Sequence, residues 1–317
     1  IYNILMFSEI SRRVRAADYL TVAELFLKDN FLLKTPLSFS DVKPRLLGHW
    51  GTCHGINLAY ANLRAVYKFR DFQFILGPGH GFPALNANLF LDGELEKVDK
   101  NATRNLSGIE YLCKNFSWPS GFPSHASPLT PGVVVEGGEL GYALGAAYGA
   151  SLGRPERTVA VLLGDGELET ASTLASMNLN KLISGEKNGK VLPILALNGY
   201  KISGPTVYGR KSEREMNELL RGFGFTPLVF DGENPERFQY ILEKAESLEK
   251  PFLVMKVEKG FGCPAELNGN KLSGNYLAHQ IPLPLAKSDE TQLKLLEAWL
   301  KSYNFDELYS DGKGFDL

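Results

Sequence analysis

Two apolar segments of this chain each end at a side chain that can bind a cation. Residues 161–164 lead directly into Asp165, and residues 192–197 lead into Asn198. Apolar runs of this length, rich in Val, Ile and Leu, are typical of parallel strands buried on both faces. Ligands of doubly wound sheets bind at the carboxyl ends of the strands. A carboxylate and a carboxamide placed there have the oxygen atoms that Mg²⁺ prefers.

The residues around Asp165 favour a phosphate-bearing ligand. Gly164 and Gly166 flank the carboxylate, and glycine lets a diphosphate approach the backbone closely. Proteins usually hold Mg²⁺ by one or two side chains, and phosphate oxygens supply further ligands. The interval from Asp165 to Asn198 has room for one crossover helix and a loop. Two ordinary strand-to-helix turns remain the alternative interpretation, because Gly-Asp-Gly by itself occurs in many turns and calcium loops.

Four histidines lie in loop sequences that could support proton transfer: His49, His80, His125 and His279. Imidazole titrates near neutral pH, so it can move protons or bind anions. Each of them alone could be an ordinary hydrogen-bonded loop histidine. Several of them at one face of the sheet would instead form a reactive site. The sequence has no His-x-x-x-His or Cys-x-x-Cys pattern, so we do not expect zinc.

Strands and helices that could position these side chains alternate along the second half of the chain. We expect strands over residues 72–76, 158–163, 191–197, 227–231 and 252–257, and helices over residues 137–152, 170–184, 212–222 and 235–248. This alternation predicts an α/β fold with a doubly wound, mostly parallel sheet and helices on both faces. We expect one domain over residues 1–317, with an N-terminal arm at 1–44 and a C-terminal loop-helix extension at 260–317.

Composition narrows the classes of protein. The 317 residues are 44% hydrophobic and 22% charged, as in globular proteins. A net charge of −2 without a dense basic block argues against nucleic-acid binding. The chain has no apolar run long enough for a membrane span and no signal-peptide pattern at its start. Its three widely spaced cysteines favour a reducing, cytoplasmic location.

Read together, these segments resemble the N-terminal domain of phosphoketolases, which are thiamine enzymes of the transketolase-like superfamily. The resemblance runs from about residue 16 to about residue 310. It rests on segments 28–33, 44–52, 77–81, 136–142, 164–170 and 197–202. It implies a thiamine diphosphate-binding fold. It also implies a carbon–carbon lyase of carbohydrate metabolism that splits ketose phosphates with inorganic phosphate.

The resemblance also assigns roles to single residues. It implies that Mg²⁺ is bound by the side chains of Asp165 and Asn198 and by the backbone carbonyl of Tyr200. It implies that the four histidines orient substrate hydroxyls, transfer protons and help to expel water, with an imidazolium as the acid. The residues that would contact thiamine diphosphate are Thr52, His80, Gly138, Glu139, Leu140, Gly164, Asp165, Gly166, Glu167, Asn198 and Lys201.

The chain differs from the family chiefly in length, because phosphoketolases are more than twice as long. The family's pyrimidine-binding region is not in this sequence. We therefore expect it to come from missing C-terminal domains or from a separately encoded subunit. We expect the isolated chain to be inactive. We also expect it to form homo-oligomers, such as a dimer, through an apolar face around residues 137–152.

A local difference leaves two other functions open. Ala265 stands where the family tends to carry a lysine that approaches the cofactor. Without that lysine, the site would lack a charge-assisted contact to the cofactor worth about 1.5–3 kcal/mol. One alternative is a non-catalytic binding or assembly module that keeps the fold. The other is a split transketolase-type transferase, which a lack of phosphate dependence would distinguish from a phosphoketolase.

Overall fold

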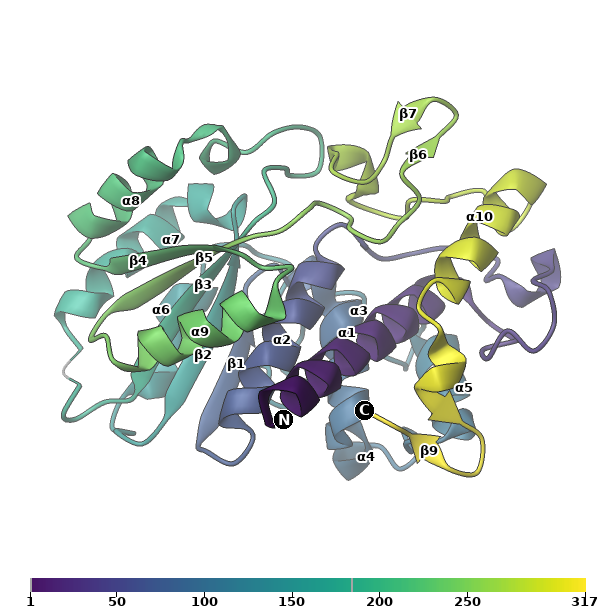
Figure 1. Cartoon of the computed structure of the whole chain (residues 1–317), viewed down its shortest axis with the longest axis horizontal. Coiled ribbons are helices and arrows are strands. Elements are labelled where there is room, and N and C mark those ends of the chain that lie inside the picture. The colour runs from purple at the N-terminus through teal and green to yellow at the C-terminus, as the bar shows by residue number, and fades with distance from the viewer. Residues whose placement is uncertain (1, 184) are drawn as a thin grey trace. The chain divides into compact units, whose positions relative to one another are not determined.

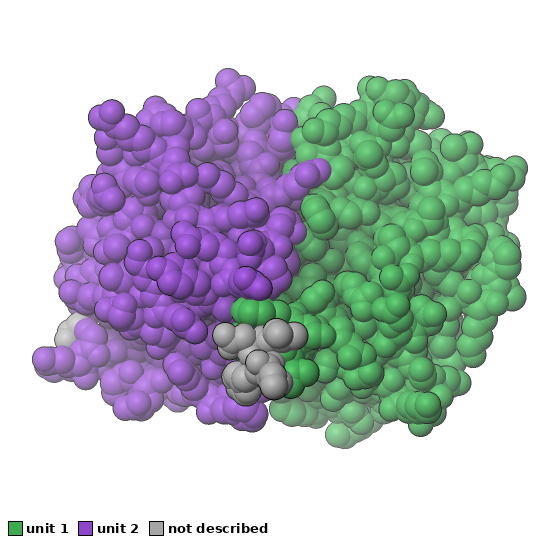
Figure 2. Space-filling model, viewed as in Figure 1, with its two compact units in different colours: residues 1–57, 80–125, 259–317 green, residues 58–79, 126–258 purple. Residues whose placement is uncertain are grey.

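The structure is a computed structural model that describes residues 2–183 and 185–317. The chain forms two compact units (Figure 2). Unit 1 comprises Ile1–Asn57, His80–His125 and Lys259–Leu317, and unit 2 comprises Leu58–Gly79 and Ala126–Glu258. Ile1, the first residue of the expected arm, and Ser184, the last residue of an expected helix, lie outside the described residues. The single-domain boundaries stay a prediction.

Unit 2 contains a five-stranded sheet with the order β1-β2-β3-β5-β4 (Figure 1). All of its pairings are parallel. The strands are β1 (Phe72–Leu76), β2 (Thr158–Gly164), β3 (Lys190–Leu197), β4 (Thr226–Asp231) and β5 (Pro251–Lys256). Each expected strand is confirmed to within one residue at either end, because apolar runs bounded by polar or small residues mark buried strands clearly.

Helices cover both faces of the sheet. Val159, Val161 and Leu163 of β2 belong to one core with helix α6 (Ala143–Ser151). On the opposite face, Phe230 of β4 meets Phe238 of α9 (Pro235–Glu246) with ring centroids 4.9 Å apart. Burial of each such side chain contributes roughly 1.5–3 kcal/mol to the stability of the fold. Unit 2 also contains α7 (Ala171–Ser176) and α8 (Glu213–Gly222). The expected doubly wound sheet is therefore confirmed.

Unit 1 is mostly helical. The long helix α1 (Tyr2–Phe26) packs against α3 (Phe82–Asp92) and α5 (Leu106–Asn115). The unit also contains α4 (Glu94–Val98), α10 (Glu290–Lys301) and two small hairpins. The hairpins are β6 (Glu266–Leu267) with β7 (Asn270–Lys271), and β8 (Tyr309–Ser310) with β9 (Gly314–Phe315). Helix α2 (Cys53–Tyr67) begins in unit 1 and ends in unit 2.

The helix expected over residues 137–152 is shorter than predicted, because α6 begins only at Ala143. Gly141 has φ +104°, outside the helical region, and a Cβ there would lie 2.3 Å from Thr170 Oγ1. Residues 137–142 therefore form a turn before the helix. Their small side chains fit a helical pattern equally well, which explains why the sequence did not reveal the turn.

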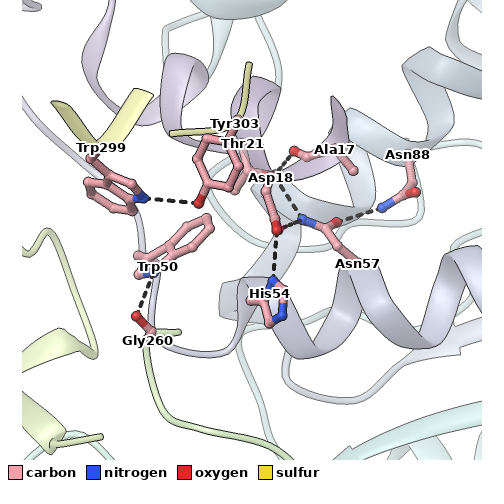
Figure 3. Close-up of polar contacts among 10 residues, drawn as sticks. All are labelled: Ala17, Asp18, Thr21, Trp50, His54, Asn57, Asn88, Gly260, Trp299 and Tyr303. Atoms are coloured by element: carbon pink, nitrogen blue, oxygen red, sulfur yellow. Dashed lines mark hydrogen bonds and ion pairs between the residues drawn. The ribbon is translucent and has the colours of Figure 1, made fainter. Parts of the chain in front are cut away.

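Buried polar side chains of unit 1 join helices α1, α2 and α3 (Figure 3). Asp18 of α1 lies 2.7 Å from His54 Nδ1 and accepts a hydrogen bond of 2.7 Å from Asn57 Nδ2, both on α2. Asn57 Oδ1 in turn accepts from Asn88 Nδ2 of α3 at 2.6 Å. Because buried polar groups are costly unless paired, this network fixes how the start of α2 is placed.

None of the helices in the described part of the chain is long and apolar enough to cross a membrane.

Candidate functional site

The ends of β2 and β3 meet through Asp165. Its Oδ2 accepts hydrogen bonds from the Gly199 amide at 2.6 Å and from Thr206 Oγ1 at 3.1 Å. Its Oδ1 accepts from the Gly166 amide at 3.0 Å. Asn198 Oδ1 accepts from the Tyr200 amide at 3.0 Å. The structure thus brings Asp165 together with residues 198–200, as the strand spacing predicts.

A tight turn after β3 aims this backbone at Asp165. Gly199 has φ +83°, a left-handed conformation that glycine adopts without strain. The turn is closed by the Thr206 amide, which donates to the Gly199 carbonyl at 2.9 Å. Gly209 packs so closely that a Cβ on it would lie 2.5 Å from the Gly199 Cα. Glycine is therefore needed at both positions for this geometry.

The donor set at these strand ends suits a hard cation bound together with an anion. Carboxylate, carboxamide and backbone carbonyl oxygens are ligands of Mg²⁺. In the described parts of the chain, no group of three or more His, Cys, Asp or Glu side chains could hold a metal ion by itself. A cation beside Asp165 would therefore take further oxygens from phosphate or water. A cavity of about 310 Å³, lined by Asn198, Gly199 and Lys211, opens beside this turn.

The other residues predicted to border a diphosphate lie in the turn before α6 or next to Gly166. Gly138, Glu139 and Leu140 are exposed in the turn before α6, and there is open space around the Cα of Gly138. A Cβ added to Gly166 would lie 3.5 Å from the Cβ of Lys201. Lys201 therefore bounds the space next to this glycine. Lys201 itself forms an ion pair with Glu169.

Glu167 is buried and has a structural contact on each oxygen. Its carboxylate accepts from the Gly141 amide at 3.2 Å and from the Gly164 amide at 3.3 Å. Burial raises the pKa of Glu167 to about 7. A Cβ on Gly77 would lie 2.1 Å from its Oε2, so β1 also approaches closely. Glu167 therefore joins the ends of β1 and β2 to the turn before α6.

The four predicted histidines form one cluster in unit 1. The ring centroid of His49 lies 5.1 Å from that of His80 and 5.4 Å from those of His125 and His279. The rings of His80 and His279 stack at 4.8 Å. Four segments that are far apart in the sequence therefore place their imidazoles side by side.

Backbone hydrogen bonds hold these segments together. The Trp50 amide donates to the Gln280 carbonyl at 3.1 Å, and the Gly260 amide donates to the Gly51 carbonyl at 2.8 Å. The indole of Trp50 donates to the Gly260 carbonyl at 3.2 Å (Figure 3). Thr52 follows directly and is buried just before α2 begins. A Cβ on Gly51 would lie 2.6 Å from Lys259 Cε, so only glycine permits this approach.

Lys259 is a member of the cluster that the sequence reasoning did not single out. Its side chain is only 2% exposed, and its Nζ lies 3.0 Å from His279 Nδ1. The available signal was its position, because it follows the apolar run 252–257 as Asp165 follows β2.

The cluster favours neutral imidazoles. Burial, with the charges of His125 and Lys259, lowers the pKa of His49 to about 4. Burial, Lys259 and His49 lower the pKa of His279 to about 3. The pKa of His80 also falls well below its usual value, chiefly through burial. His49 and His279 therefore favour the neutral, proton-accepting form near neutral pH. The imidazolium acid that the resemblance implies stays a prediction.

Two ring nitrogens in the cluster are suited to a ligand. Within the described residues, His49 Nδ1 and His80 Nε2 are buried and have no hydrogen-bond partner. Buried polar atoms are nearly always paired, so unpaired ones mark places where a bound molecule or water completes the network. His125 differs, because its Nδ1 lies 3.0 Å from Ser124 Oγ.

Comparison with solved structures defines the class of fold. The chain superposes on a transketolase from Leishmania mexicana with a TM-score of 0.63 and 18% identity, covering 94% of this chain and 45% of that one. It superposes on a transketolase variant from Pichia stipitis with a TM-score of 0.65, also at 18% identity, covering 93% and 43%. The fold is the α/β fold of transketolase-like proteins.

Sequence comparison identifies the family. Residues 5–250 and 241–315 match the family model described as the XFP N-terminal domain. A probable phosphoketolase from Bradyrhizobium diazoefficiens is 42% identical over 95% of this chain. One from Streptomyces avermitilis is 42% identical over 94%. The chain belongs to the family of phosphoketolase N-terminal domains, and it spans 40% and 41% of the length of these two relatives.

Proposed function

We propose that this chain is the diphosphate- and Mg²⁺-binding part of a thiamine diphosphate-dependent phosphoketolase. Such a lyase splits a ketose phosphate with inorganic phosphate. The observation that carries the proposal is the contact of 2.6 Å between Asp165 Oδ2 and the Gly199 amide. It joins the ends of two neighbouring parallel strands, where ligands of doubly wound folds bind.

The cation would be held by Asp165, Asn198 and the carbonyl of Tyr200. Gly164, Gly166, Lys201 and the exposed turn at residues 138–140 would border the diphosphate. Gly138 has the open space that a close backbone approach requires. Glu167 would support this binding through the turn before α6. We assign Thr52 and His80 as further cofactor contacts on the family resemblance.

When bound, thiamine diphosphate supplies the stabilised carbanion needed to break the bond next to a ketose carbonyl. The protein would supply proton transfer and orientation. Neutral His49, His80 and His279 can accept protons from substrate hydroxyls. Lys259 Nζ, 3.0 Å from His279 Nδ1, can return a proton through that ring. A substrate hydroxyl would then leave as water after receiving a proton that the histidine cluster had accepted earlier.

The proposed cofactor site also needs a region that this sequence does not contain. The curated relatives are about two and a half times longer than the matched part, because the chain covers 40% of the first of them. We therefore propose a pyrimidine-binding region that is supplied by further C-terminal sequence or by another subunit. The isolated chain would bind the cofactor without turning over sugar phosphate.

Calorimetry can test the binding role. Thiamine diphosphate is titrated into the wild-type chain with and without Mg²⁺, and into Asp165→Asn and Asp231→Asn. Asp231 is a matched control, because it is the last residue of β4 and is exposed. We expect Asp165→Asn to weaken Mg²⁺-dependent binding at least tenfold and Asp231→Asn to leave it unchanged. Equal affinity in the wild type and Asp165→Asn, with circular dichroism showing both folded, would contradict the assignment.

A further inference from the structure

Unit 1 contains a second pocket, of about 260 Å³, that the proposed function does not use. It shares no lining residue with the histidine cluster or with the predicted cofactor contacts. Four of its nine lining residues are basic, namely Lys28, Lys43, Arg45 and Lys114, and none is acidic. The lining of the pocket therefore carries an excess of positive charge.

The positive charge of this pocket is only partly compensated. Lys114 pairs with Glu110 at 3.2 Å, and both side chains are exposed. Among the described residues, Lys28 and Arg45 have no ion pair. Lys43 Nζ donates to the backbone carbonyl of Glu24 at 2.6 Å, which does not neutralise the ammonium group.

The nearby Glu24 carboxyl is also a weak compensating charge. Its side chain is fully buried and accepts from Asn86 Nδ2 at 2.9 Å. Burial raises the pKa of Glu24 well above its usual value. Burial also lowers the pKa of Lys43, so the positive charge of the pocket comes chiefly from Lys28, Arg45 and Lys114.

The rest of the lining is apolar and aromatic. Phe116 is buried, and Lys43 Nζ lies 5.6 Å from the centroid of its ring. Trp118 is 57% exposed, which is unusual for so large an apolar side chain. Its loop is fixed, because the Ser117 amide donates to the Phe122 carbonyl and the Gly121 amide to the Trp118 carbonyl, each at 2.9 Å. These backbone bonds therefore keep Trp118 in a fixed loop that lines the pocket.

We propose that this pocket binds a small organic anion whose phosphate or carboxylate groups are joined to one flat apolar ring. The anionic end would lie among Lys28, Arg45 and Lys114, since arginine and lysine bind such oxygens through charge-assisted hydrogen bonds. The ring would stack against Trp118 and Phe116. The volume is at the small end for ligand pockets, which limits the apolar part to about one ring.

Tryptophan fluorescence can test this proposal. Trp50 and Trp299 are 0% and 3% exposed, so Trp118 alone should respond to a ligand in the pocket. The full chain is titrated at constant ionic strength with phenyl phosphate, inorganic phosphate and phenol. We expect saturable quenching by phenyl phosphate, with at least tenfold higher affinity than for either of the other two. A Trp118→Phe variant should lose the optical signal.

Charge variants complete the test. The double variant Lys28→Gln with Arg45→Gln should weaken phenyl phosphate binding at least tenfold. Lys294→Gln removes an exposed lysine of unit 1 outside the pocket and should have no effect. If inorganic phosphate binds as tightly as phenyl phosphate, the apolar lining contributes nothing and the proposal is wrong. It is equally wrong if no probe binds or if the double variant binds like the wild type.

Discussion

The pKa values of the clustered imidazoles depend on Lys259, a residue with almost no exposure. Burial and the lysine charge place the pKa of His49 at about 4 and that of His279 at about 3. We expect NMR titration of the histidine ring signals to give values below 5 for both. Lys259→Met should move the His279 value upward by about one unit, because it removes a cation 3.0 Å away.

Lys271→Met is the matched control for this titration. Lys271 is an exposed lysine of the same unit, in the short strand β7, so its removal should leave both histidine values unchanged. A wild-type His279 value near 6.5 would contradict the neutral cluster. An unchanged His279 value in Lys259→Met would show that burial alone is responsible.

The same imidazoles should make the fold sensitive to acid. Their pKa values are lower in the folded chain than the ordinary value of 6.5, so the unfolded chain binds more protons below that pH. The contribution of these histidines to the free energy of unfolding is fully present above pH 6.5. It is lost progressively as the pH falls toward 4. We expect His279→Asn to lose about 1–2 kcal/mol less than the wild type between pH 6.5 and 4.5. Urea unfolding at several pH values measures this, and parallel curves would contradict it.

For single residues, the sequence predicted where the candidate site residues lie better than it predicted their pKa values. Asp165 and Asn198 follow strands whose apolar runs are clear, so their meeting at one sheet edge was predictable. The lowered pKa values of His49, His80 and His279 were not predictable, because they depend on burial and on Lys259. Lys259 itself lies three residues beyond its strand, in a loop whose path a pattern of residue types does not define.

Among the elements, the strands were predicted best. Each is an apolar run with distinct ends, whereas helices with unusual composition were harder to place. Helix α3 (Phe82–Asp92) was not predicted, because it is buried from Phe82 to Leu91 and so has no polar face to give it periodicity. Helix α6 was predicted too long, because small residues continue through the turn that precedes it.

The turn after β3 provides a test at the level of a single element. Gly199 has φ +83°, so Gly199→Ala should cost about 1–2 kcal/mol and disturb the amide that contacts Asp165. Gly204→Ala is the control, because Gly204 lies in the same loop with open space around it. Urea unfolding of both variants measures the costs. Equal stability of the two variants would contradict the requirement for glycine at position 199.

For the whole chain, each unit contains one part of the proposed chemistry. Unit 2 contains the cation and diphosphate residues, and unit 1 contains the imidazole cluster. Exposed Leu140, Tyr142 and Leu152 lie in the segment where we expected a self-association surface. The homo-oligomer stays a prediction, which light scattering at several protein concentrations can check.

The length of the relatives sets the prediction for activity. We expect the purified chain, given thiamine diphosphate, Mg²⁺, inorganic phosphate and a ketose phosphate, to release no acetyl phosphate. The reason is that the proposed pyrimidine-binding region lies outside this sequence. An enzymatic assay for acetyl phosphate measures this. Turnover by this chain alone would contradict the need for a further region, although not the proposed diphosphate site.

The central claim is that Asp165 and residues 198–200 bind a cation together with a diphosphate. Mn²⁺ in place of Mg²⁺ tests it directly, because this paramagnetic ion broadens nearby NMR signals. With thiamine diphosphate present, we predict that the Gly166 and Gly199 amide signals disappear first. The signal of Gly189, which precedes β3 at the opposite end of that strand in the same unit, should persist. Uniform broadening, or the same pattern without thiamine diphosphate, would contradict the claim.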